Sequence, residues 1–263
     1  MNATAIDISQ DNRQMGGLGA RAFRAGLAAG AGGLALAVLA CFFSDGGWRR
    51  FFFAYLVNFC FFLSLSLGAL FFVALQHATR AGWSVAARRL AEAVAMNLSW
   101  LAALALPVLL LGMGALFPWA RDAAPGEANP VLEGKRAYLN IPFFWLRTAA
   151  CFAIWIWLAR RFFRLSARQD ATGDPALTTQ MERLAPGAIL LFALTITFFS
   201  FDWLMSLDPL WFSAIFGLYY FSGAFVGFMA FLALLAIGLQ ASGRLRRTIT
   251  REHFHDVGKL VFA

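Results

Sequence analysis

Six apolar stretches, each long enough to cross a bilayer as a helix, constrain this sequence more than any other feature. A helix needs about 20 apolar residues to cross a hydrocarbon core of about 30 Å. In lipid the backbone must satisfy its own hydrogen bonds, and the stretches lack the alternation of barrel strands, so we expect helices. The sequence predicts an all-α, polytopic bundle with spans at approximately 24–44, 52–76, 96–118, 141–160, 186–207 and 212–239.

The bundle takes up residues 23–240, between two polar segments. Residues 1–22 form a polar tail that lacks the early apolar region of a secretory signal. Residues 241–263 form a basic C-terminal segment. The chain is 60% hydrophobic, against about half for a soluble domain, so lipid is the expected solvent. We predict a multi-pass protein.

The basic residues indicate the orientation of the bundle. Of 22 Lys and Arg residues, 16 lie at the N-terminus, in the second and fourth loops and after the last span. The positive-inside rule then places both termini in the cytoplasm of a bacterial inner membrane. Because the net charge of +8 falls in short segments between spans, we reject binding to nucleic acid.

The loops differ in their expected structure. Residues 119–140, which contain several Pro and Gly residues, are expected to be irregular and periplasmic. Residues 78–95 are expected to form a short interfacial helix whose arginines lie near anionic lipid headgroups. Residues 160–185 are expected to be a solvated loop with a turn at Gly173 and Pro175.

Two carboxylates in the aromatic run 198–212 are the candidate functional residues. An ionised group in lipid costs several kcal/mol unless it is paired, hydrated or neutralised. Asp208 precedes Pro209, so the preferred interpretation is a cap for the following helix, with proton handling as the alternative. Asp202 lies deeper in the span, and a structural and a proton-handling role are equally open.

Arg147, about five residues into the fourth span, has two possible roles. Its side chain either snorkels to the interface or forms a buried pair with Asp202, which is expected at similar depth. Nearby aromatic residues either contact a quinone ring or tail, or form a lipid-facing belt: Trp203, Trp211 and Tyr219.

The cysteines and histidines predict that this chain binds no cofactor and has no metal site. The cysteines lie in apolar runs without metal-type spacing: Cys41, Cys60 and Cys151. The histidines lie at span ends or beyond, where no pair ligates a haem across helices: His77, His253 and His255. We group these histidines with Asp256 as ion-pair or interface residues.

Several separated motifs carry a resemblance to a known family. They are FAYL (53–56) with GALFF (68–72), HATRAGWS (77–84), RQD (168–170), FDWLMSLDP (201–209) and HFHDVGKL (253–260). From about residue 50 onward the chain resembles the ActF-type membrane subunit of alternative complex III. This complex is the bacterial quinol:cytochrome c oxidoreductase that is unrelated to cytochrome bc1, and the subunit belongs to the NrfD-like superfamily.

The resemblance implies a subunit that carries no cofactor and is not catalytic alone. Its partners are expected to be a sister NrfD-like subunit with the principal quinol site, an iron-sulfur subunit and c-type cytochrome subunits, together with quinol and lipid. Members usually have about ten spans. The segment 241–263 is therefore expected to be the start of a missing span, in a truncated or split chain.

The leading functional hypothesis is thus a quinone-associated, proton-handling or scaffolding subunit of a respiratory quinol:cytochrome c oxidoreductase. One alternative is a small secondary transporter, a class with broken helices and ionisable groups at the midplane. Pro107 is the one mid-span break candidate, and the ionisable residues cluster near the boundaries. The other alternative is a purely structural membrane scaffold.

Overall fold

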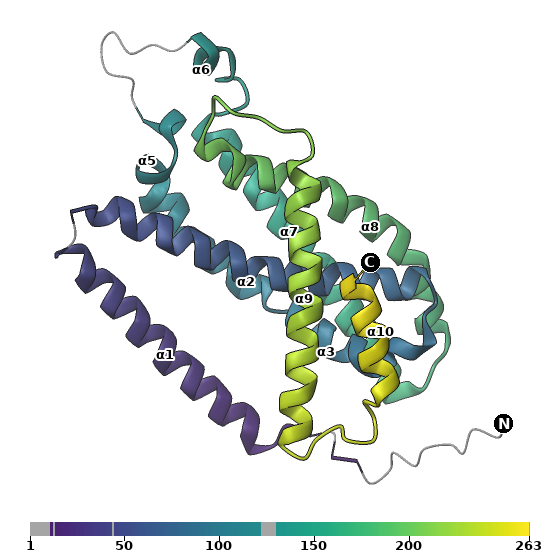
Figure 1. Ribbon diagram of the computed structural model, residues 1–263. Helices are drawn as coiled ribbons and strands as arrows, with labels where there is room; N and C mark the ends of the chain where they lie inside the picture. The colour runs from purple at the N-terminus through teal and green to yellow at the C-terminus, as the bar shows by residue number, and fades with distance from the viewer. Residues whose placement is uncertain (1–10, 13, 44, 122–129, 263) are drawn as a thin grey trace.

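The structure is a computed structural model that describes residues 11–12, 14–43, 45–121 and 130–262 (Figure 1). The described residues form helices and turns and contain no strand. Ten α-helices are described: α1 (Gly17–Cys41), α2 (Gly47–Ala78), α3 (Val85–Ala95), α4 (Leu98–Pro107), α5 (Met113–Leu116), α6 (Pro130–Gly134), α7 (Ile141–Thr172), α8 (Ala176–Trp203), α9 (Phe216–Ala241) and α10 (Arg251–Phe262). Short helical turns supplement them: η1 (Gly82–Ser84), η2 (Val108–Gly112), η3 (Pro118–Ala120) and η4 (Met205–Leu207).

Six helical segments of the described chain are long and apolar enough to cross a membrane. The third runs from Gly82 to Leu116 and combines η1, α3, α4, η2 and α5. It changes to a π-helical turn directly after Pro107, which has no N–H group to continue the α-helical ladder. The predicted all-α polytopic bundle with six spans is confirmed.

Helix α2 occupies the centre of the bundle and packs against α3, α7, α8 and α9. Gly68 lets α9 approach closely, because a Cβ atom there would lie 2.4 Å from the carbonyl oxygen of Ala224. Large rings fill the core, including the fully buried Trp155 and Trp203. The interior is therefore held by aromatic packing and by the close approach of α2 and α9 at Gly68.

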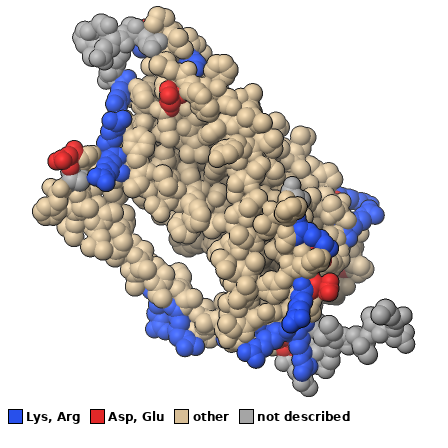
Figure 2. All heavy atoms as spheres, in the orientation of Figure 1, with Lys and Arg blue, Asp and Glu red and all other residues tan. Residues whose placement is uncertain are grey.

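Charged side chains gather at two opposite ends of the molecule and leave an apolar band between them (Figure 2). The N-terminal segment meets the segment after α9 at one end. There the Leu245 amide donates to the Asn12 carbonyl oxygen at 3.2 Å, and Arg244 donates to the carbonyl oxygens of Gln14 and Met15. Both described ends of the bundle therefore lie on the same side, as an even number of spans requires.

Two predicted loops contain more helix than expected. α7 continues to Thr172 and α8 begins at Ala176, so the expected solvated loop 160–185 is a turn of three residues. Gly173 caps α7 in the left-handed conformation, at φ 67°, which confirms the predicted turn. The segment expected to be irregular contains α6, while its residues 122–129 lie outside the described residues.

Helix α1 is separated from the rest of the bundle along most of its length. None of its residues is buried, and Figure 2 shows an open gap between it and the body of the molecule. It begins at Gly17, inside the segment predicted to be a tail. α10 packs against α9 at the same end of the molecule and buries Val257.

Candidate functional site

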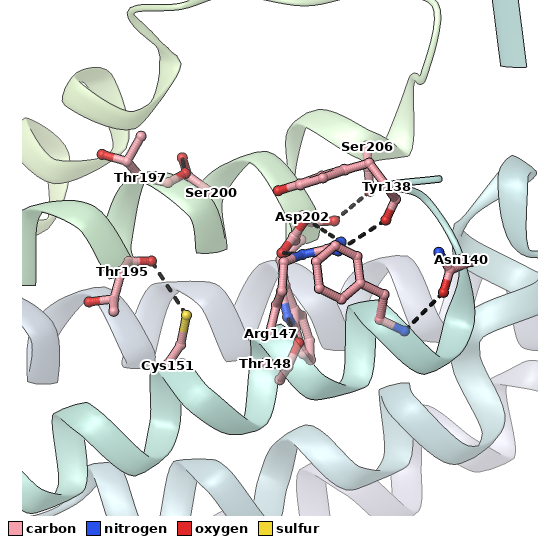
Figure 3. Close-up of polar contacts among 12 residues, drawn as sticks. Tyr138, Asn140, Arg147, Thr148, Cys151, Thr195, Thr197, Ser200, Asp202 and Ser206 are labelled. Carbon is pink, nitrogen blue, oxygen red and sulfur yellow. Dashed lines mark hydrogen bonds and ion pairs between the residues drawn. The ribbon is translucent and has the colours of Figure 1, made fainter. Parts of the chain in front are cut away.

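Arg147 and Asp202 form a bidentate ion pair between α7 and α8 (Figure 3). Arg147 Nε donates to Asp202 Oδ2 at 2.7 Å, and Nη2 donates to Oδ1 at 2.9 Å. The two side chains are 11% and 2% exposed. Of the two interpretations of Arg147, the buried pair is confirmed.

Local structure places both partners at the same end of the bundle. Asn140 begins α7 by accepting a hydrogen bond from the Phe143 amide at 3.0 Å, so Arg147 falls in the second turn. Asp202 lies in the last turn of α8, which ends at Trp203. The Ser206 hydroxyl donates to the Asp202 carbonyl oxygen and supports that turn.

Two aromatic rings cover the guanidinium group of Arg147. Its Cζ lies 3.9 Å from the ring centroid of Tyr138 and 4.2 Å from that of Phe143. Nη1 donates to the Tyr138 carbonyl oxygen at 3.0 Å. Burial raises the pKa of the Tyr138 phenol, and the negative charge of Asp202 raises it further. The phenol is therefore neutral beside the ion pair at neutral pH.

Trp203 lies in the core, which corrects its assignment as a residue that contacts lipid or quinone. It is 0% exposed, and its indole stacks on Phe199 at 5.2 Å between centroids. Its Nε1 donates to the Thr148 hydroxyl on α7 at 3.0 Å. The residue following Asp202 thus joins the same two helices as the ion pair.

A second polar contact joins α7 and α8 deeper in the bundle. Trp155 Nε1 donates to the Thr195 hydroxyl at 2.7 Å, and that hydroxyl donates to the Leu191 carbonyl oxygen at 2.7 Å. The Cys151 thiol lies 3.6 Å from the Thr195 carbonyl oxygen. Each buried polar group in this set has a partner, so it stabilises the helix pair at little cost.

Asp208 does not cap a helix, contrary to the preferred interpretation. Its Oδ1 accepts from the Leu210 amide at 3.1 Å in a local turn, and α9 begins only at Phe216. The carboxylate lies on the exposed surface and is not part of the ion pair. Trp211 and Tyr219 are 49% and 74% exposed, so both are accessible to a membrane ligand.

A second polar cluster lies at the opposite end of the bundle, around Arg89 on α3. Arg89 pairs with Glu92 at 3.0 Å and with Asp170 on α7 at 2.7 Å, and donates to Ser166 at 3.1 Å. Arg80 pairs with Glu182 on α8 at 3.2 Å. The segment 78–95 contains the expected short helix. Arg80 and Arg89 each pair with at least one carboxylate there.

His77 is buried at the end of α2, although it was grouped with the interface residues. It is 1% exposed, and its ring stacks on Phe162 at 5.5 Å between centroids. Neither ring nitrogen, nor the nearby Gln76 Oε1, has a hydrogen-bond partner among the described residues. This corrects the assignment of His77 as an ion-pair or interface residue.

The remaining interface candidates lie on α10. His253 Nδ1 accepts from the Thr250 amide at 3.2 Å, which helps to begin the helix. His255 is exposed, and Asp256 pairs with Lys259 at 3.1 Å within one turn of the helix. The structure therefore does not bring these three residues together with Arg147 or His77.

Several residues of the two clusters were not identified from sequence. Tyr138 lies in an irregular segment, so no helical periodicity in the sequence indicates that its side chain faces the bundle. Glu92 follows Arg89 by three residues, and this helical spacing was an available signal for a pair. The partners Asp170 and Ser166 are brought close only by tertiary packing.

Comparison with known proteins adds no relative. Neither a scan against protein-family models nor a search of curated proteins gives a match to this chain. The fold and the site nevertheless define the class: the chain is a multi-pass, α-helical integral membrane protein with a buried Arg–Asp pair between α7 and α8.

Proposed function

We propose that this chain is a cofactor-free membrane subunit of a bacterial quinol:cytochrome c oxidoreductase of the alternative complex III type. In this proposal the chain lies in the inner membrane beside a sister NrfD-like subunit. Iron-sulfur and c-type haem subunits carry the electrons. The chain itself contributes a quinone-associated or proton-handling surface at the end of the bundle that contains Asp202.

The observation that carries this proposal is the buried ion pair between Arg147 and Asp202. Replacing such a pair with well-packed apolar residues is often neutral or stabilising, so stability alone does not account for it. Intramembrane ionisable residues commonly mark ion or proton pathways. A carboxylate at this position is suitably placed for chemistry that releases protons at one membrane face.

The motifs behind the resemblance also supply polar contacts between elements. In the 201–209 motif, Asp202 pairs with Arg147. In the 168–170 motif, Asp170 pairs with Arg89. The motif at 77–84 contains the buried His77 and Arg80, which pairs with Glu182. These motif residues all lie where helices contact each other. This supports the resemblance, because a similarity in composition alone would not place the motifs at such contacts.

The geometry specifies what proton handling by Asp202 requires. The pair is neutral as a unit, and both carboxylate oxygens are engaged by Arg147. To accept a proton, Asp202 must release at least one of these contacts. Arg147 then keeps the Tyr138 carbonyl oxygen and the two flanking rings as partners. The proposed cycle is therefore an opening and closing of the pair.

Exposed aromatic residues provide a surface for the quinone near this site. Trp211 and Phe212 follow the turn at Asp208, and Tyr219 lies in the first turns of α9. All three rings are exposed and lie at the same end of the bundle as Asp202. Flat rings at the membrane interface suit a quinone head or an isoprenoid tail.

A purely structural scaffold is the second candidate function, and helix α1 favours it. This helix has 25 residues, none of them buried. Small residues dominate it, and in membranes they allow close approach of another helix. A scaffold would use this surface to hold sister subunits and would not need the ion pair for turnover.

The subunit assignment is tested by purification of the tagged chain from its native membrane in mild detergent. Haem staining and mass spectrometry then identify what accompanies it. The proposal expects a multihaem c-type cytochrome, an iron-sulfur protein and a second NrfD-like chain. Isolation of the chain without any redox partner would contradict the proposal.

The proton-handling role is tested on the assembled complex. The variant Arg147→Met/Asp202→Leu removes both charges together and so avoids an unpaired buried charge. We expect quinol:cytochrome c turnover per assembled complex to fall by at least tenfold. Acid–base groups typically contribute about 10² to 10⁴ to a rate. Asp208→Asn is the matched control and should keep turnover. Wild-type turnover in the double variant would leave only the scaffold role.

A further inference from the structure

A basic cavity lies between the end of α9, the connecting residues 242–250 and the first turns of α10. Its volume is about 390 Å³. The described residues that line it are Gln240, Arg246, Arg247, Ile249, Thr250, Arg251 and Phe254. This cavity is at the opposite end of the bundle from the ion pair, so it is separate from the site described above.

Three of the lining residues are arginines, and none of the described lining residues is acidic. The Nε of Arg246 donates to the Gln240 carbonyl oxygen at 3.1 Å, which fixes this side chain at the cavity. Arg251 lies on the exposed first turn of α10. Guanidinium groups form strong, charge-assisted hydrogen bonds with phosphate oxygens.

An acidic side chain, that of Asp11, contacts the connecting segment. Its carboxylate accepts from the amides of Arg246, Arg247 and Thr248 and from the Thr248 hydroxyl. These contacts direct Asp11 to the backbone of the connecting segment. The twelve-residue helix α10 begins at the cavity, and its N-terminal dipole adds to the attraction for an anion.

The cavity also has an apolar side, which distinguishes a lipid from a free anion. Ile249 and Phe254 line both the basic cavity and a narrow apolar cleft between α3, α9 and α10. The cleft continues along Leu232 and Ala236, which belong to the membrane-spanning helix α9. A ligand with a charged head and an apolar body matches this change from arginines to hydrocarbon.

We propose that this cavity binds the phosphate group of an anionic phospholipid, with Arg246, Arg247 and Arg251 as its ligands. The acyl chains then lie along the apolar surface of α9. Basic pockets at the membrane surface recognise anionic headgroups in this way. The lipid would fasten α10 to the end of α9, where the N-terminal segment also docks.

The test is titration of the full-length chain in detergent with phosphatidylglycerol, followed by native mass spectrometry of the bound lipid. Phosphatidylcholine, whose headgroup has no net charge, is the lipid control. We expect the variant Arg246→Gln/Arg247→Gln/Arg251→Gln to bind phosphatidylglycerol at least tenfold more weakly, since each surface arginine contributes roughly fivefold. Binding of phosphatidylcholine as tightly as phosphatidylglycerol by the unaltered chain would overturn the proposal.

A matched control variant removes the same number of positive charges from another site at this end of the bundle. Arg161→Gln/Arg164→Gln/Arg168→Gln removes three exposed arginines of α7 and should keep the affinity. Equal losses in both triple variants would show attraction by net charge alone and would overturn the site. If the first triple variant does not fold, Arg251→Gln decides: a roughly fivefold loss supports the site, and unchanged binding overturns it.

Competition separates the lipid from a free anion. Inorganic phosphate and glycerol phosphate contain the phosphate group without acyl chains. At millimolar concentration they should displace little phosphatidylglycerol if the apolar side of the cavity contributes to binding. Complete displacement by inorganic phosphate would assign the cavity to a free phosphate and overturn the lipid proposal.

Discussion

Arg147 on α7 and Asp202 on α8 are 55 residues apart in sequence and join two neighbouring helices through two hydrogen bonds of 2.7 and 2.9 Å. Each charge is buried, so each needs the other. Loss of one partner from a buried pair leaves an uncompensated charge and costs about 3–5 kcal/mol, whereas removal of both is often neutral. A reaction at this end of the bundle that changes the charge of either residue would therefore also change the stability of the fold.

The first prediction concerns the cost of an unpaired charge. Asp202→Asn is nearly isosteric, yet it leaves the Arg147 guanidinium without a counter-charge, and should destabilise the chain by about 3–5 kcal/mol. The measurement is the thermal unfolding midpoint of the chain in detergent.

Arg147→Met/Asp202→Leu is the control for this variant. With both charges removed, its midpoint should lie much closer to that of the unaltered chain. A double variant as unstable as Asp202→Asn would show that the loss comes from packing and not from charge. Asp208→Asn, at an exposed turn, should leave the midpoint unchanged.

The second prediction concerns the aromatic cover of the guanidinium group. Tyr138→Leu removes a ring whose centroid lies 3.9 Å from Arg147 Cζ. A desolvated cation–π contact contributes up to about 2 kcal/mol, so the unfolding midpoint should fall measurably. Tyr138→Phe keeps the ring and should retain most of the stability. Equal losses in both variants would instead assign the contribution to the phenol oxygen.

The sequence predicted the helices well because long apolar runs that lack the alternation of barrel strands can cross lipid only as helices. Backbone groups must bond within each segment, so length and hydropathy alone define six spans. The same reasoning failed beyond the membrane boundary. α7 and α8 extend through residues that read as a polar loop, because a polar helix in water carries no hydropathy signal.

The candidate site was predicted only in part. Their positions in the predicted spans put Arg147 and Asp202 at a similar depth in the membrane. A pair was therefore possible, since each charge lowers the free-energy cost of burying the other. Depth in the membrane does not indicate which face of a helix packs against the bundle. For this reason Trp203 was assigned as a quinone or lipid contact, although it is fully buried against Phe199 and Thr148.

The third prediction concerns the closest helix approach in the core. Gly68→Ala would place a Cβ atom 2.4 Å from the Ala224 carbonyl oxygen, so α2 and α9 must separate. Overpacking of this kind costs about 1–3 kcal/mol, measured as a lower unfolding midpoint. The matched control is Gly30→Ala on α1, where no atom lies within 4 Å. A loss of similar size in the control would contradict the packing explanation.

The fourth prediction concerns the clamp between the two ends of the chain. The Thr248 hydroxyl holds the pKa of Asp11 below its ordinary value, with help from three backbone amides, while partial burial opposes the shift. A lowered folded-state pKa means that the clamp is intact above about pH 4 and is lost as pH falls through that lower value. Asp11→Ala should open it at every pH.

Hydrogen exchange of the amides of Arg246, Arg247 and Thr248 measures the state of this clamp. All three donate to Asp11, so all three should exchange faster in Asp11→Ala at neutral pH. The control is Glu252→Gln, which changes an exposed carboxylate two residues into the next helix. Unchanged protection in Asp11→Ala would show that the segment is held by other contacts, such as that of Arg244 with Gln14.

The last prediction concerns the orientation of the bundle in the membrane. Both ends of the described chain lie on one side, and the positive-inside rule predicts from the excess of Lys and Arg that this side is cytoplasmic. Ala137 and Ala171 are both exposed and lie at opposite ends of α7, Ala137 just before the helix and Ala171 in its last turn. In a Cys41→Ser background, with Cys60 and Cys151 buried, Ala137→Cys should react with an impermeant maleimide in intact cells. Ala171→Cys should react only after the membrane is permeabilised. The reverse pattern would place the Arg147–Asp202 pair at the cytoplasmic face, where protons released by quinol oxidation would not be expected, and would contradict the proposed role of Asp202.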